Sequence, residues 1–316
     1  MDYRAEARSP DITNQKGLRN SRPGQGLVDP LDLKIENQKL SDRDFQRLRT
    51  FVKEKTGISL SDVKRTMLQA RLQKRLRELH LDSFSDYCQY LFSPDGMENE
   101  IVKFIDTVTT NKTDFFREPH HFDFLVNTAI PFLRENGLMH GNSLNVWSAA
   151  CSTGMEPYTL AMVLSGHESI NQGFSWSILG TDISSNVLEK AVQAIYKEDD
   201  IEPVSMELRK KYLLRSSNRA SQLVKIVPEL RSRVEFKELN FIDDNYDIPQ
   251  RFEIIFCRNA IIYFDRATTL KILKRITHHL IPGGFLFLGH SESLNGFPIP
   301  FDTVGTTVYQ KRLVKP

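Results

Sequence analysis

The chain is poor in cysteine and lacks any long apolar run, and these two absences exclude several classes of protein. Cys88, Cys151 and Cys257 lie far apart and form no CxxC pair. We therefore expect neither a disulfide framework nor a zinc site, and no bound metal. No apolar run approaches the roughly 18 residues of a membrane span. The sequence therefore predicts no direct insertion into a membrane.

Two further absences concern the N-terminus and the charge. The first residues lack the apolar core of a signal peptide, which predicts a cytoplasmic protein. The formal net charge of +2 gives no general reason to expect a nucleic-acid partner. The chain contains 40% hydrophobic and 26% charged residues, which is typical of a protein with ordinary buried cores. Its length of 316 residues indicates about two domains.

The first third of the sequence predicts a tail followed by helices. Residues 1–39 mix charges with prolines and glycines without sustained periodicity, which indicates a disordered N-terminal tail. Residues 40–117 predict a small all-helical domain and a linker, in which Ser41 fits a helix N-cap and Gly57 fits the end of that helix. Further helical patterns cover residues 61–80, 84–92 and 98–108.

The helix predicted at residues 61–80 is markedly basic, with six cations against Asp62 and Glu78. Charge runs of this kind are usually solvated faces. The same asymmetry is also what a docking surface for an acidic partner requires, and both interpretations stay open. The cations are Lys64, Arg65, Arg71, Lys74, Arg75 and Arg77.

A strand, a turn of small residues and a helix follow one another in the middle of the chain. Leu144–Trp147 is typical of a buried strand, Ser148–Gly154 of a turn, and a helix is expected to start near Pro157. The small side chains let a ligand lie against the backbone, and a helix N-terminus presents unpaired N–H groups. Glu156 adds a carboxylate that would repel a phosphate and hold an ammonium or a sulfonium. A tight turn without a ligand is the alternative.

Beyond this stretch, strands and helices alternate, which predicts an α/β fold with a doubly wound, mainly parallel sheet over residues 118–316. Additional strands are predicted at 176–180, 234–239, 253–257, 285–289 and 306–311, and helices at 122–135, 186–195 and 266–280. An insertion at about 211–232 interrupts the alternation. Its segments 212–215 and 223–227 predict a small antiparallel β-hairpin, and hence an inserted β-subdomain.

Polar residues fall just past the carboxyl ends of four of the predicted strands. Ligands bind beyond the carboxyl ends of parallel strands, and Glu156, Asp182, Asn240 and Asn259 all fall there. An acidic residue after the second strand is what a nucleoside ribose requires, although Asp182 could instead cap the next helix. The first strand is not followed by G-x-G-x-x-G, which argues against a dinucleotide. A nucleoside with a zwitterionic or cationic end remains, and S-adenosylmethionine fits that description.

Five segments of the chain carry these features in a fixed order. They are Thr109–Glu118, Trp147–Tyr158, Thr181–Ile183, Phe256–Asp265 and Gly289–Glu292. Their order and spacing resemble those of the chemotaxis receptor glutamate methyltransferases, the CheR family, over about residues 40–312. The resemblance implies the S-adenosylmethionine-dependent methyltransferase fold, with S-adenosylhomocysteine as product. It also implies formation of glutamate methyl esters on the cytoplasmic domain of methyl-accepting chemoreceptors, the adaptation step of bacterial chemotaxis.

The resemblance implies roles for individual residues. Glu156 and Arg117 would address the methionine end of the cofactor, Asp182 the ribose hydroxyls, and Asn240 the region of the adenine. Arg117 and Tyr263 would be the catalytic residues that touch the substrate carboxylate, and the basic helix would dock the methylation helices of the receptor. The implied cofactor set is Asn111, Thr113, Arg117, Glu156, Asp182, Asn240, Phe241, Asn259 and Ala260.

The chain departs from the family pattern at two places. Met155 stands where relatives often carry a second glutamate, and the turn Ser216–Ser221 lacks the glycines of relatives that bind a receptor's C-terminal pentapeptide. We therefore expect an enzyme that works without such a tether and is recruited to membrane receptor arrays through the receptors themselves. We also expect a monomer.

Two alternatives to this function stay open. One is a methyltransferase of the same fold that acts on another protein or a small molecule. The other is a catalytically idle adaptor that senses S-adenosylmethionine. A nucleic-acid partner is not expected, because the cations occupy one helix without interleaved aromatic residues.

Overall fold

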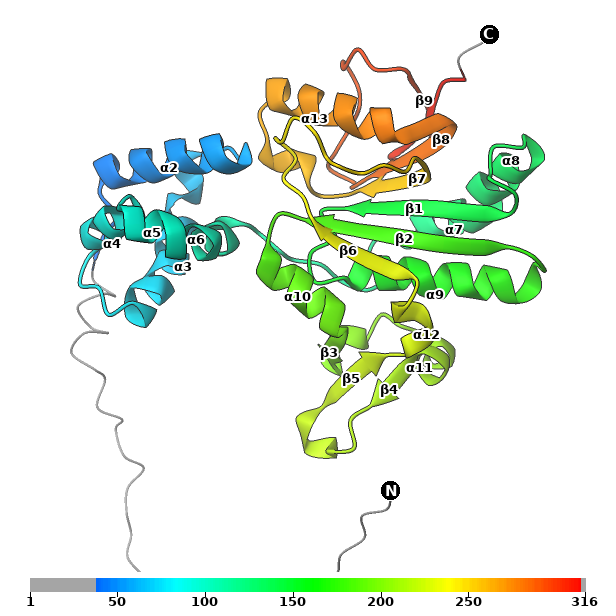
Figure 1. The fold of residues 1–316 in the computed structure, drawn as a ribbon, viewed down its shortest axis with the longest axis horizontal. Coiled ribbons are helices and arrows are strands. Elements are labelled where there is room, and N and C mark those ends of the chain that lie inside the picture. The colour runs from blue at the N-terminus through cyan, green and yellow to red at the C-terminus, as the bar shows by residue number, and fades with distance from the viewer. Residues whose placement is uncertain (1–37, 314–316) are drawn as a thin grey trace, which may run out of the picture.

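The structure, a computed structural model, describes residues 38–313 and consists of a helical domain, an α/β domain and a small second sheet (Figure 1). The tail predicted at residues 1–39 lies almost entirely outside the described part of the chain. None of the helices within residues 38–313 combines the length and the apolar character that crossing a membrane requires.

The helical domain is built from short, capped helices that share one core. The first, α2 (Asp42–Thr56), begins at Ser41, whose side chain caps it, and ends at Gly57 in the left-handed conformation, with φ 74°. Apolar residues of α2 and the leucines of α3 belong to the same buried core. The remaining elements are η1 (Asp62–Lys64), α3 (Arg65–Glu78), α4 (Phe84–Leu91), α5 (Pro94–Asn99) and α6 (Ile101–Val108).

The main sheet has seven strands in the order β6-β2-β1-β7-β8-β10-β9. The strands from β6 to β8 are parallel, whereas β10 runs antiparallel to both β8 and β9. Every residue of β7 is buried, as expected for a central strand that is covered on both faces. The strands are β1 (Ser143–Ala149), β2 (Ser175–Asp182), β6 (Val234–Glu238), β7 (Phe252–Cys257), β8 (Leu280–Leu288), β9 (Phe301–Gly305) and β10 (Val308–Lys311).

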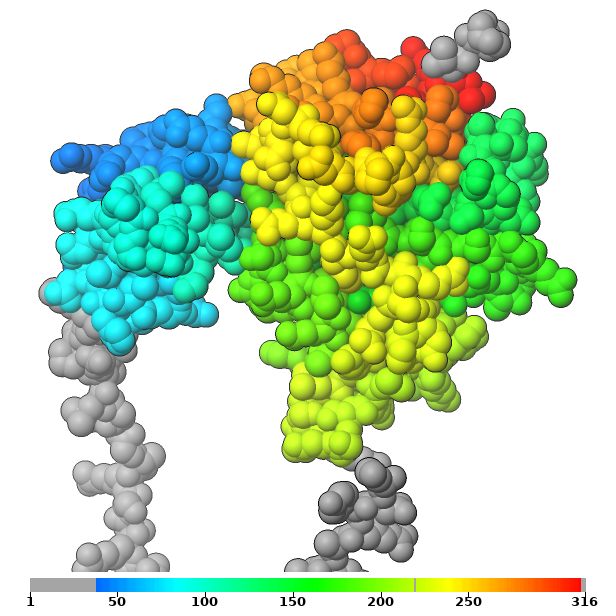
Figure 2. Space-filling view, in the orientation of Figure 1, coloured from blue at the N-terminus to red at the C-terminus, as the bar shows by residue number. Residues whose placement is uncertain are grey.

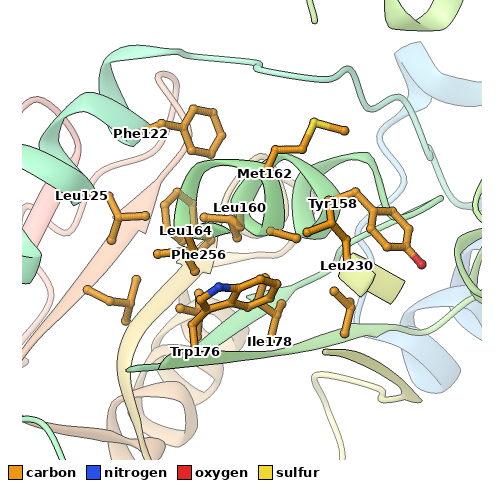
Figure 3. Packing of buried hydrophobic residues seen from close by; sticks show 14 of the residues in the cluster. Phe122, Leu125, Tyr158, Leu160, Met162, Leu164, Trp176, Ile178, Leu230 and Phe256 are labelled. Atoms are coloured by element: carbon orange, nitrogen blue, oxygen red, sulfur yellow. The ribbon is translucent and has the colours of Figure 1, made fainter. Parts of the chain in front are cut away.

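Helices cover both faces of this sheet, with α13 on one side and α9 and α10 on the other (Figure 1). Figure 3 shows the apolar side chains of α9, among them Leu160 and Leu164, packed over Trp176 and Ile178 of β2. The helical elements are α7 (His120–Phe124), the π-helix η2 (Leu125–Ala129), α8 (Ile130–Glu135), α9 (Met155–Ile170), α10 (Ser185–Gln193), η3 (Asp199–Ile201), α11 (Met206–Tyr212), η4 (Arg219–Ser221), α12 (Pro228–Arg231), η5 (Ile261–Tyr263) and α13 (Arg266–His279).

The inserted subdomain is a three-stranded antiparallel sheet rather than the two-stranded hairpin predicted from the sequence. Its order is β3-β5-β4, with β3 at Ile195–Lys197, β4 at Leu213–Arg215 and β5 at Leu223–Ile226. The predicted helix through residue 195 is wrong because Ala194 adopts the left-handed conformation, with φ 54°. This residue ends α10 and releases the next segment to pair with β5.

Other element boundaries also differ from the predictions. The helix after the turn begins at Met155, two positions before Pro157. Strand β8 begins at Leu280 instead of residue 285, with an irregularity in its pairing to β7. The closing strand predicted at 306–311 is β10, and it pairs with β9, which was not predicted.

Hydrogen bonds join the helical domain to the α/β domain. The Ser59 amide donates to the Tyr263 carbonyl at 2.8 Å, and the Asn240 side-chain amide donates to the Lys55 carbonyl at 2.7 Å. Figure 2 shows the α2 region, in blue, against the yellow segment that follows β6. The predicted class is confirmed: an α/β fold with a mainly parallel sheet, an N-terminal helical domain and an inserted antiparallel subdomain.

Candidate active site

A cavity of about 290 Å³ opens where the helical domain meets the carboxyl ends of β1, β2, β6 and β7. Its volume is just below the ~300–1,000 Å³ range of ligand pockets. Lys64 and Met67 of the helical domain contribute to its wall. All nine residues implied for the cofactor line it, together with Tyr263: Asn111, Thr113, Arg117, Glu156, Asp182, Asn240, Phe241, Asn259 and Ala260.

The loops around the cavity contain several non-glycine residues in the left-handed conformation, which is uncommon. In the turn after β1, Ala150 has φ 63° and Ser152 has φ 51°. Phe116 and Glu118, on either side of Arg117, have φ 52° and 56°. Each such residue costs free energy, and such residues cluster at ligand sites, where the surrounding structure holds them in place.

Asp182 lies at the end of β2 and is 7% exposed. Its carboxylate accepts the Ser152 amide at 2.8 Å and the Ser184 amide at 3.0 Å. Burial raises the pKa of Asp182, and these two amide bonds oppose that shift. A carboxylate offers about four acceptor positions, so acceptor capacity remains for a ribose hydroxyl. The geometry therefore fits the nucleoside predicted from the sequence.

Glu156 is paired inside the protein by an arginine whose role the sequence did not reveal. Arg258 Nε donates to Glu156 Oε2 at 2.7 Å, and Ser148 Oγ donates to Oε1 at 2.6 Å. Arg258 also donates to the Arg117 carbonyl at 2.6 Å, so it joins the turn after β1 to the loop that carries Arg117. Glu156 and Arg258 both line the cavity, so an ion pair already formed within the protein makes up part of its wall.

Sequence reasoning missed Arg258, although it lies in the segment Phe256–Asp265, directly after a buried strand and next to Asn259. The available signal was a cation at the carboxyl end of a central strand. Its partner Glu156 lies 102 positions away in the sequence, so the pairing itself becomes visible only in three dimensions.

Arg117 and Tyr263, the residues implied for the substrate, line the same cavity from different loops. Arg117 makes one long bond, from Nη1 to the Lys112 carbonyl at 3.4 Å. Lys64 Nζ lies 4.8 Å from the centroid of the Tyr263 ring. Burial, and then the charge of Arg71, lowers the pKa of Lys64. The wall of the cavity therefore carries cations that suit an anionic substrate.

The other cations of the basic helix have different surroundings. Arg75 and the buried Glu100 pair at 2.6 Å, and Arg71 donates to the Thr109 carbonyl at 2.7 Å. These two contacts hold α3 to α6 and to the linker. The side chain of Lys74, in contrast, is 80% exposed. The docking role of this helix stays a prediction.

The described residues contain no group of three or more His, Cys, Asp or Glu side chains arranged to hold a metal. The three cysteines are buried and free.

Comparison with known proteins identifies the class. Residues 111–310 match the family model described as "CheR methyltransferase, SAM binding domain", and residues 43–109 match "CheR methyltransferase, all-alpha domain". With the mainly parallel sheet and its cavity, these matches define an S-adenosylmethionine-dependent methyltransferase.

The relatives narrow the class to a family. The chain is 39% identical over 270 residues to the chemotaxis protein methyltransferase of Salmonella typhimurium, covering 85% of this chain and 90% of the relative. It is 38% identical over 274 residues to that of Escherichia coli, covering 87% and 92%. The chain belongs to the CheR methyltransferase family.

Among solved structures, the chain is similar to an S-adenosylmethionine-dependent methyltransferase from Clostridium acetobutylicum. The TM-score is 0.31 at 18% identity, and the match covers 61% of this chain and 56% of that one. The family assignment rests on the sequence matches alone.

Proposed function

We propose that this enzyme methylates glutamate side chains on the cytoplasmic domain of chemoreceptors. The observation that carries the proposal is the convergence of Arg117, Glu156, Asp182 and Tyr263 on one cavity between the two domains. The relatives that are 38–39% identical over most of the chain are named chemotaxis protein methyltransferases, which supports the same role here.

In this proposal the residues of the chain bind the cofactor, orient the substrate and exclude water from the cavity. S-adenosylmethionine, when bound, supplies a methyl group on a positively charged sulfur. Asp182 would accept the ribose hydroxyls, while Glu156 and Arg117 would address the methionine end. A glutamate with an ordinary pKa of ≈ 4.3 is already an anion at neutral pH, so this step requires no general base.

Charge disappears as the reaction proceeds. The cofactor would supply a methyl group whose transfer to a carboxylate oxygen, with cleavage of the carbon–sulfur bond, would leave a neutral ester and a neutral thioether. A dry cavity with well-placed groups therefore favours the transition state more than an added charge would. We assign Arg117 and Tyr263 the orientation of the substrate carboxylate. An Arg117→Lys enzyme with wild-type turnover would contradict the role of Arg117.

The helical domain supplies the receptor contact in this proposal. Lys64 lines the cavity, and Lys74, whose side chain is 80% exposed, lies 3.7 Å from Glu78 Oε1 on the same helix. Arg71 and Arg75 contribute by fixing the position of α3 through their bonds to Thr109 and Glu100. The enzyme acts as a monomer and reaches membrane receptor arrays through the receptors that it methylates.

Receptor methylation in this proposal needs no C-terminal tether. The connection between β4 and β5, residues 216–222, contains no glycine. We expect titration calorimetry to detect no binding of a receptor C-terminal pentapeptide at micromolar concentrations. Micromolar binding would contradict the tether-free part of the proposal and leave the methyl transfer itself unaffected.

The function is tested with purified enzyme, methyl-labelled S-adenosylmethionine and receptor cytoplasmic fragments. We expect label that base treatment releases, as it does from methyl esters, and loss of labelling when the receptor glutamates are replaced by alanine. Base-stable label would favour a methyltransferase with another target. Cofactor binding without label on any fragment would favour a sensing adaptor.

A further inference from the structure

Glu292, the last residue of the segment Gly289–Glu292, lies next to the active-site loop and is 4% exposed. Its carboxylate accepts four backbone N–H groups. Gly289 and Asn259 each donate to Oε2 at 2.7 Å, and Ile261 and Ile262 donate to Oε1 at 2.8 and 3.3 Å. These amides belong to the end of β8 and to the loop after β7, which are neighbouring strands (Figure 1). One side chain thus joins the carboxyl ends of two strands.

The loop that Glu292 holds forms part of the cavity wall. Asn259, Ala260, Ile262 and Tyr263 all line the cavity. Asn259 has φ 57°, a left-handed conformation that asparagine adopts more readily than most other residues. The Asn259 amide, which donates to Glu292, helps to hold the loop in this conformation. Without the carboxylate, several of the buried amides in this loop would lose their acceptor, which is costly for each of them.

Gly289 allows the two strand ends to approach closely enough for this contact. A Cβ at this position would lie 2.3 Å from the Asn259 side-chain nitrogen and 2.8 Å from the Asn259 backbone nitrogen. No real Cβ tolerates such distances, so any side chain here would push the loop away from β8. Glycine at the first position of the segment and glutamate at the last therefore serve the same junction.

We propose that Glu292 is a positioning residue for methyl transfer, because its carboxylate fixes the loop that presents Asn259 to the cofactor and Tyr263 to the substrate. The Tyr263 part rests on the proposed function, whereas the Asn259 part concerns cofactor binding alone. A glutamine cannot replace the carboxylate, since its single amide oxygen leaves an NH₂ donor facing two of the N–H groups.

Burial raises the pKa of Glu292, and the amide bonds, of which the bond from Gly289 has the largest effect, oppose that shift. Desolvation is costly for any buried carboxylate. The test therefore needs a control carboxylate that is equally buried. Glu253 provides the match: it is also 4% exposed, burial also raises its pKa, and it accepts the Asn145 amide at 2.7 Å near the opposite end of β7.

The test compares the Glu292→Gln, Glu292→Asp and Glu253→Gln proteins with wild type. Amide hydrogen exchange of residues 258–263 measures the loop, calorimetric titration with S-adenosylhomocysteine measures the cofactor site, and kcat and KM measure turnover. For Glu292→Gln we expect at least tenfold faster exchange in that segment, at least tenfold weaker binding and a lower kcat. For Glu253→Gln we expect all three to stay within twofold of wild type.

Three results would overturn the proposal. The first is a folded Glu292→Gln protein with loop exchange and cofactor affinity within twofold of wild type. The second is an equal loss in Glu253→Gln, which would show a general effect of buried charge. The third is rapid hydrogen exchange of the Asn259 and Ile261 amides in the wild-type protein. This measurement requires no variant.

If Glu292→Gln does not fold, Glu292→Asp decides the question. It keeps the charge but is one methylene shorter, so it cannot reach both strand ends, and we expect at least threefold weaker cofactor binding. Affinity within twofold of wild type would overturn the proposal. Binding and exchange involve no receptor, so a wild-type enzyme that binds the cofactor and labels no receptor would refute the proposed function and leave the role of Glu292 intact.

Discussion

Replacing Arg258 by Met should destabilise the cofactor-free protein by about 3–5 kcal/mol, because it leaves a buried charge without its partner. In the wild type, Arg258 Nε and Glu156 Oε2 are 2.7 Å apart, and their side chains are 2% and 11% exposed. Methionine keeps the apolar contact with the rings of Phe122 and Phe256, over which the guanidinium lies. What is lost is the charge opposite Glu156 and Glu118, the donor to the Arg117 carbonyl and the contact with His121 Nδ1.

Urea unfolding followed by tryptophan fluorescence suits this measurement. The two tryptophans of the chain, Trp147 in β1 and Trp176 in β2, are 0% and 3% exposed. Their signal therefore reports the α/β domain separately from the helical domain, which limits the error of treating a two-domain protein as one transition. Cofactor must be absent, since a bound ligand adds its own stabilisation.

A double-mutant cycle separates the ion pair from other effects. Glu156→Gln combined with Arg258→Met should be about 2–3 kcal/mol more stable than the sum of the two single losses predicts. Arg312 provides a matched control, since its Nε lies 2.8 Å from Asp302 Oδ1 with both side chains about 60% exposed. Arg312→Met should cost at most about 1 kcal/mol. Additive losses in the cycle, or equal losses at Arg258 and Arg312, would refute the reasoning.

Three further predictions concern the cofactor site and the domain junction. Asp182→Asn should weaken S-adenosylhomocysteine binding about 10–100-fold in calorimetry, because a charged acceptor for the ribose hydroxyls is lost. In the wild type, burial raises the pKa of Asp182 above its ordinary value of 3.8. The ionised form of Asp182 binds the hydroxyls. The affinity for S-adenosylhomocysteine should therefore decline as the pH falls through that raised pKa. This decline should begin at a higher pH than it would for an aspartate with an ordinary pKa. Gly57→Ala should destabilise the protein by more than the ~1–2 kcal/mol of the left-handed backbone, because φ is 74° and the added Cβ would lie 2.4 Å from Ile242 Cγ2.

Each of these predictions has a comparison that can contradict it. The acid decline in affinity should be reduced in Asp182→Asn, and an unchanged pH profile would remove Asp182 from the ribose site. Gly137 also has a positive φ, of 64°, and an added Cβ there would have no heavy atom within 4 Å. Gly137→Ala should therefore show the backbone cost alone, and a thermal or urea midpoint equal to that of Gly57→Ala would rule out the clash at the domain junction.

The sequence predicted those parts of the fold that depend on local patterns. Ser41 and Gly57 marked the ends of α2, and the buried runs marked the central strands, because caps and hydrophobic periodicity act over a few residues. The end of α10 was not predictable in this way, since Ala194 adopts a left-handed conformation that its residue type does not favour. The pairing of β3 with β5 joins Ile195 to Lys225, a long-range contact that leaves no local pattern.

The same distinction applies to the site. Asp182 and Asn240 were found because each follows a strand, and strand ends of a parallel sheet meet at one edge. Arg258 and Glu292 follow strands as well, but their partners come from other segments: a carboxylate 102 positions away for Arg258 and four amides from two strand ends for Glu292. The sequence showed which residues lie at the edge of the sheet. Only the structure showed which of them form ion pairs and hydrogen bonds with one another.

The most direct measurement is a crystal structure of the enzyme with S-adenosylhomocysteine. It should show the ribose hydroxyls on the Asp182 carboxylate, the methionine end beside Glu156 and Arg117, and the sulfur directed toward Tyr263. A nucleoside bound elsewhere, or no nucleoside in this cavity at a saturating concentration, would contradict the central claim.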